Sequence, residues 1–135
     1  MKRLAVGLLM TICAMPVSAQ SAIVSGMGET LLETYTAYIG PDDLYNSNGQ
    51  RLKQPWQIIR QDRANYHRYG LRDRGDEGDS FFDSADNRAV MEQMLKNGQI
   101  SNAAAREIVG GDVLIQVDIY GRGNRGTSVY VTTFR

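Results

Sequence analysis

The stretch PWQIIRQDRANYHRYGLRDRGDEGD, residues 55–79, decides how this chain folds. It opens with a proline, which is common at the first position of a helix, and Gly70 is a typical helix end. At 100° per residue its larger apolar side chains gather on one arc, as in an amphipathic surface helix. The stretch therefore predicts a helix from Pro55 to Tyr69 whose apolar face carries Trp56, Ile58, Ile59, Tyr66 and Tyr69.

Two charged residues, Asp62 and Arg63, fall inside this apolar arc. Charged side chains are rarely buried without partners. Neighbours i and i+1 on a helix diverge by about 100°, so we expect the two to bind other groups rather than each other. In our interpretation Asp62 accepts hydrogen bonds from a loop backbone, while Arg63 lies along aromatic rings with its guanidinium in water. We expect these two residues, with Trp56 and Tyr66, to have structural roles.

The only histidine, His67, lies in the same stretch and is the natural candidate for acid–base catalysis. On a helix, positions 62 and 67 differ by about 140°, so Asp62 cannot orient His67 as in a catalytic triad. No G-x-S-x-G elbow is present. We therefore expect His67 on the helix surface, and Asp62, Arg63 and His67 are weak catalytic candidates. A small carboxylate-based hydrolase or lyase around Asp62, with Glu33 and Asp118 meeting it across the core, stays open as an alternative.

An acidic loop follows the helix, in which Asp73, Asp76, Asp79 and Asp83 are interleaved with arginines and glycines. In one interpretation these carboxylates are solvated, cap the next helix or pair with arginines. In the other they converge on Ca²⁺, which takes roughly six to eight oxygen ligands. Their spacing matches no calcium motif, but a calcium-stabilised extracytoplasmic domain using residues 73–83 is a second alternative.

The N-terminus has the three parts of a secretory signal peptide: the basic start MKR, the apolar run LAVGLLMTICAM, and small residues at Val17 and Ala19. We expect cleavage near Ala19, which leaves residues 20–135 as a single domain. No later stretch approaches the ~20 apolar residues of a membrane-spanning helix. The sequence therefore predicts a periplasmic or secreted protein with no membrane span in the mature chain.

Composition excludes several kinds of site from the mature chain. Cys13 is the only cysteine and lies within residues 1–19, so cleavage removes disulfides, thiolate zinc sites and cysteine nucleophiles. One histidine cannot supply a conventional zinc site. The formal charge is balanced, with 15 basic and 15 acidic residues, which argues against a nucleic-acid partner. We expect no cofactor apart from the calcium alternative.

The remaining segments predict one N-terminal strand, over residues 29–39, two further helices and a C-terminal hairpin. Ser84 or Asp83 is the expected cap of the second helix and Ser101 that of the third. The hairpin linker GRGNRG, residues 121–126, matches the dinucleotide-binding pattern in letters, but a strand rather than a helix follows it. The expected fold is α+β: a small antiparallel sheet of the N-terminal strand and the C-terminal hairpin, with two to three helices packed on one face.

The strands are unusually rich in aromatic residues, which suggests that both faces of the sheet are apolar. Helices on one face would leave aromatic side chains exposed on the other, and exposed apolar patches are typical of interaction sites. The sequence thus favours a non-catalytic protein-interaction or accessory module with a protein partner. The aromatic strand residues are Tyr35, Tyr38, Tyr120, Tyr130 and Phe134.

Overall fold

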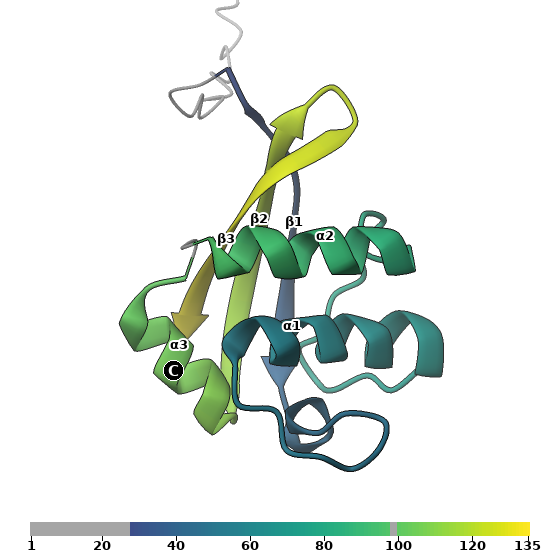
Figure 1. Cartoon of the computed structure of the whole chain (residues 1–135), viewed down its shortest axis with the longest axis vertical. Helices are drawn as coiled ribbons and strands as arrows, with labels where there is room; N and C mark the ends of the chain where they lie inside the picture. Colours follow the sequence, from purple (N-terminus) through teal and green to yellow (C-terminus); the bar gives the residue numbers. More distant parts are fainter. Residues whose placement is uncertain (1–27, 98–99) are drawn as a thin grey trace, which may run out of the picture.

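The structure, a computed structural model, describes residues 28–97 and 100–135. The predicted signal peptide, residues 1–19 with its cleavage site at Ala19, lies outside the described residues. The predicted α+β fold is confirmed, with helices on one face of an antiparallel sheet (Figure 1). In chain order the elements are β1 (Thr30–Ile39), the 3₁₀ turn η1 (Pro41–Leu44), α1 (Pro55–Ala64), the π-helical turn η2 (Asn65–Tyr69), α2 (Ala85–Lys96), α3 (Asn102–Gly110), β2 (Val113–Arg122) and β3 (Arg125–Phe134).

The sheet has the order β1-β2-β3, with β2 in the centre and both pairings antiparallel. Alternate residues of each strand point to the helix layer, so β2 buries Val113, Ile115, Val117 and Ile119. Figure 1 shows α1 and α2 crossing this face side by side, while the tip of the β2–β3 hairpin projects beyond α2. The core between the layers also includes the fully buried Tyr35, Ala37, Ile39, Ile58, Ile59, Phe82, Met91, Ile108 and Val129.

A β-bulge interrupts the β1–β2 pairing between Leu31 and Glu33. The bulge changes which side chains face the core, because a shift of one residue moves a side chain to the opposite face. Leu31 pairs with Tyr120 and Thr34 with Asp118, so all four lie on the face without helices. Simple alternation along the strand would put Leu31 on the same face as the buried Tyr35. Because of the bulge, the two side chains are on opposite faces.

The central helix begins at Pro55 and ends at Gly70, as predicted, but its last turn is π-helical rather than α-helical. Gly70 closes it in the left-handed region, at φ 68°. A π turn has i→i+5 hydrogen bonds and more residues per turn, so side chains beyond Ala64 leave the positions expected at 100° per residue. As a result Tyr69, predicted on the apolar arc, is 47% exposed. Asn65, seven residues after the buried Ile58 and therefore on the same side of the helix, is buried.

Local signals predicted the other element boundaries well. The Ser84 side chain accepts a hydrogen bond from the Asn87 amide, and Ser101 accepts one from Ala104, so both serines are N-caps. The hairpin strands extend through most of GRGNRG, which leaves a tight turn at Gly123, with φ 58°. In the part of the chain that the structure describes, no helix has the length and apolar character needed to cross a membrane.

Candidate functional site

Asp62 and Arg63 contact each other directly, contrary to our expectation. The Arg63 Nε donates to Asp62 Oδ2 over 2.7 Å, and both side chains are buried. Adjacent helical positions do diverge, but the arginine side chain is long enough to curve back to its neighbour. The prediction that Arg63 keeps its guanidinium in water is therefore wrong, because the group is enclosed in the core.

The Arg63 guanidinium joins the central helix to β1 and to the acidic loop. Its carbon lies 4.2 Å from the ring centre of Tyr35 and 4.7 Å from that of Tyr66, as expected for an arginine along aromatic rings. Its Nη1 donates to the carbonyl oxygen of Glu77 at 2.9 Å and to Asp79 Oδ1 at 3.1 Å. Three segments distant in sequence thus meet at one cation. Trp56, the remaining predicted structural residue, is half-buried and packs against the core.

His67 belongs to this cluster and is not a surface residue. Its Nε2 lies 2.8 Å from Asp79 Oδ1, and its side chain is only 11% exposed. The Tyr66 ring meets it edge-on at 5.0 Å. Arg63 and His67 are four residues apart, on the same side of the helix, and both contact Asp79 Oδ1, while Asp79 Oδ2 accepts from the Phe82 amide.

Burial dominates the electrostatics of the cluster. It raises the pKa of Asp62 to about 7, although the adjacent Arg63 works in the opposite direction. Burial alone would lower the pKa of Arg63, but Asp62 and Tyr35 outweigh it, so this pKa is raised and the guanidinium stays charged. The pKa of the Tyr35 phenol is raised well above its ordinary value, again mainly by burial. Asp62, Arg63, His67 and Asp79 thus form a buried network of charged and polar side chains.

The geometry gives little support to carboxylate catalysis around Asp62. Asp62 is 1% exposed, so a substrate has no access to it. Glu33 and Asp118 do not join it: Glu33 binds the amide and hydroxyl of Ser80, and Asp118 lies on the sheet face without helices. The three weak catalytic candidates, Asp62, Arg63 and His67, come together in one buried network, in which Arg63 binds Asp62 and both Arg63 and His67 contact Asp79.

The acidic loop lies along the free edge of β1. The Glu77 amide donates to the Thr36 carbonyl at 2.8 Å, and the Thr36 amide donates to Glu77 Oε2. The Tyr38 amide donates to Asp76 Oδ1 at 2.8 Å. An exposed strand edge invites pairing with other chains, and the loop covers this one.

The four aspartates of the calcium alternative have separate roles in this loop. Asp76 receives the amides of Tyr38 and Asp73, while Asp79 belongs to the Arg63 cluster. Asp83 is exposed and borders α2. Within residues 28–97 and 100–135, no group of three or more acidic, histidine or cysteine side chains is placed to hold a metal ion.

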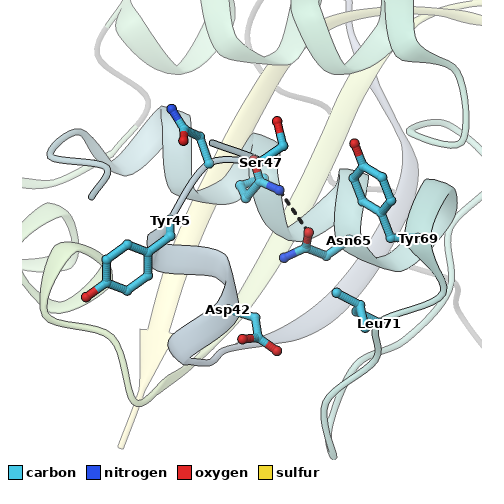
Figure 2. Close-up of a pocket in the computed structure, with 8 residues that line it drawn as sticks. Asp42, Tyr45, Ser47, Asn65, Tyr69 and Leu71 are labelled. Carbon is cyan, nitrogen blue, oxygen red and sulfur yellow. Dashed lines mark hydrogen bonds between the residues drawn. The ribbon is translucent and has the colours of Figure 1, made fainter. Parts of the chain in front are cut away.

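A pocket opens between η1 with its following loop and the end of the central helix (Figure 2). Its volume is about 480 Å³. In Figure 2 Tyr45 and Tyr69 lie on opposite sides of Asn65, with Asp42 below it and Ser47 above it. The lining residues are Asp42, Tyr45, Asn46, Ser47, Gln61, Asn65, Tyr69 and Leu71.

A chain of hydrogen bonds leads from this pocket to a buried carboxylate. Gln61 Nε2 donates to Asn65 Oδ1 at 2.8 Å, and Asn65 Nδ2 donates to Asp43 Oδ1 at 2.8 Å. Asp43 Oδ2 accepts from the Gly40 amide. Burial raises the pKa of Asp43 to about 6, although the hydrogen bonds from Asn65 and Gly40 lower it.

Sequence reasoning missed this pocket. The loop of residues 42–50 has the composition of an ordinary Asx turn, and Asn46 does make one, accepting the amides of Asn48 and Gln50. The π turn that brings Tyr69 to the pocket has no sequence signature that we can identify. The composition also gives no sign that Asp43, two residues after Pro41 in the 3₁₀ turn, is buried.

The sheet face without helices is the second candidate site. It exposes three large apolar side chains: Leu31 at 46%, Tyr130 at 42% and Phe134 at 45%. Tyr120 is half-buried beside Tyr130, with the ring centres 5.4 Å apart. Tyr38 and Leu114 also lie on this face, where the acidic loop partly covers them through Gly75.

Comparisons with protein-family models, with curated proteins and with solved structures find no match for this chain.

Proposed function

We propose that this chain is a non-catalytic protein-interaction or accessory module, exported to the periplasm or secreted, that binds a protein partner through the helix-free face of its sheet. The observation that carries the proposal is the series of aromatic and aliphatic side chains on that face, contributed by all three strands. These side chains form two groups on the face, which the polar row of Thr36, Gln116 and Thr132 separates. Exposed apolar groups on a protein surface often mark an interaction site.

The charges around this face suggest the chemistry of the partner. Asp118 lies near its centre, held by the Thr34 hydroxyl and by Gln116 Nε2. The loop along β1 adds Asp76 and Glu77, and Asp112 lies beside Tyr38. A matching partner surface carries a basic side chain opposite Asp118, further basic side chains along the β1 side, and apolar side chains opposite the exposed Leu31, Tyr130 and Phe134.

Export is supported by the sequence of residues 1–19, with its basic start, apolar run and small residues before the cleavage site. The test is the mass of the protein recovered from the bacterial envelope fraction. A mature chain beginning at Gln20 supports export, whereas an intact chain in the cytoplasm contradicts it.

The partner is tested by capture and then by matched variants. Tagged mature protein is incubated with the envelope fraction, captured proteins are identified by mass spectrometry, and the leading candidate is purified for binding measurements. Tyr130→Glu replaces an exposed aromatic ring of the face by a second negative charge beside Asp118 and should weaken binding roughly tenfold or more. Asp118→Asn should weaken it less and reduce its dependence on salt.

Val90→Glu is the control, because Val90 is 46% exposed but lies on α2, on the other side of the molecule. Equal binding by the Tyr130 and Val90 variants would contradict the proposal. If the protein forms a dimer and Tyr130→Glu dissociates it, the partner is a second copy of this chain and not a foreign protein.

A further inference from the structure

We infer that the pocket lined by Asp42, Gln61 and Tyr69 binds a small organic cation that carries N–H donors, that is, an alkylammonium or guanidinium compound. This pocket shares no lining residue with the sheet face of the proposed function, so the two proposals can fail separately. Its volume of about 480 Å³ is within the usual range of small-molecule sites.

The free polar atoms around the pocket are mainly acceptors. Asp42 is exposed, and its carboxylate makes no hydrogen bond within the described residues. Gln61 uses its Nε2 on Asn65, which leaves Oε1 as an acceptor. The hydroxyls of Ser47 and Tyr69 can accept as well. The Asp42 carboxylate and Gln61 Oε1 can only accept, so a ligand that supplies N–H donors satisfies them, while the hydroxyls of Ser47 and Tyr69 adapt to either kind of ligand.

The charge of the pocket selects a cation among such donors. None of its lining residues is basic, and Asp42 contributes a negative charge directly. Asp43 adds a second carboxylate one hydrogen bond behind Asn65. The pKa of the nearby Asp73 is raised mainly by burial and then by repulsion from Asp76 and Asp42. These carboxylates therefore lie close enough to interact. A bound cation relieves this repulsion.

The pocket walls suit an organic cation rather than a metal ion. The rings of Tyr45 and Tyr69 are 46% and 47% exposed, and Leu71 is 50% exposed. Aromatic rings attract ammonium and guanidinium groups. Tyr45 and Tyr69 already hold Arg51 and Arg68 in this way, with the guanidinium carbons 5.7 Å and 5.2 Å from the ring centres, so a bound cation shares these rings with the two arginines. The carbon skeleton of a ligand can pack on these side chains while its cationic head faces Asp42.

The test is isothermal titration of the purified protein with agmatine, which carries both an ammonium and a guanidinium group, at neutral pH and low salt. We expect saturable binding with a dissociation constant below roughly 1 mM, and about tenfold weaker binding in Asp42→Asn. Asp42 is exposed and unbonded, so this variant should fold normally. Ser47→Asp adds a carboxylate to the rim and should tighten binding.

Asp86→Asn removes an exposed carboxylate from the first turn of α2 and is the matched control, with unchanged affinity expected. Three results would overturn the inference: no saturable binding of agmatine up to roughly 10 mM, equal affinity in Asp42→Asn and the wild type, or glucose binding as tightly as agmatine. The last result would identify a site for neutral polyhydroxylated ligands instead.

Discussion

At the residue scale, Arg63 is the centre of the structure. It is fully buried and satisfies carboxylates from two segments, Asp62 and Asp79. A buried ion pair contributes little net stability compared with an apolar replacement of the whole pair, but removal of one partner leaves an uncompensated charge. Two carboxylates depend on Arg63, so it is the most sensitive member of the cluster.

We therefore expect Arg63→Met to lower the free energy of unfolding by about 3–5 kcal/mol. Arg68→Met is the matched control on the same helix, because Arg68 is exposed and contacts only the Tyr69 ring. Its cost should stay below about 1 kcal/mol. Urea denaturation followed by circular dichroism measures both variants. Similar losses for the two arginines would show that the buried network does not stabilise the fold.

The second residue-scale prediction concerns Asp43, whose pKa burial raises from 3.8 in its ordinary setting to about 6. Between pH about 4 and 6 the folded protein keeps a proton that the unfolded chain has released. Binding of this proton therefore adds about 3 kcal/mol to the free energy of unfolding. The whole contribution is present below pH about 4, and it is lost as the pH rises through about 6.

Asp43→Asn should abolish this contribution. We expect the stability difference between the wild type and the variant to shift against the wild type as pH rises from 4 to 7, in urea denaturations at fixed ionic strength. Asp62 is present in both proteins, so its own titration largely cancels in the comparison. A difference that does not change with pH would show that Asp43 titrates alike in the folded and unfolded chains.

At the element scale, the hairpin and the segment before α2 meet at a glycine. A Cβ on Gly126 would overlap the Phe81 ring, and Phe81 in turn packs edge-on against the buried Phe82 at 5.0 Å. Gly126→Ala should therefore cost about 1–3 kcal/mol of stability, because the ring must move.

Gly110→Ala is the control for this prediction. Gly110 ends α3 with open space around its Cα, so alanine there should be neutral or stabilise the protein by up to about 1 kcal/mol. Thermal or urea unfolding of the two variants compares them directly. A loss at Gly110 as large as that at Gly126 would mean that backbone freedom, and not the Phe81 contact, decides the effect.

At the scale of the whole molecule, the partners of the acidic loop bear on whether the stability of the protein depends on a metal ion. The carboxylates of Asp76 and Glu77 accept amides of β1, and that of Asp79 binds Arg63, so these three already have partners within the protein. We expect the melting temperature to be the same in excess calcium and in excess chelator, as measured by differential scanning calorimetry. An increase of several degrees in calcium would restore the calcium-stabilised alternative.

The sequence by itself determined the features that depend on neighbouring residues. Alternation of side chains, the start at Pro55, the serine caps and the glycine ends are local, and they predicted the α+β fold and its layers. The tertiary structure decided the rest. Segments distant in the chain meet at Arg63, at the covered β1 edge and at the pocket. The bulge at Leu31 and the π turn at residues 65–69 each shift the side chains near them out of the regular period of their element. Such contacts depend on where each loop lies on the folded protein. The periodic pattern of apolar residues along the chain reports only local structure and does not determine these positions.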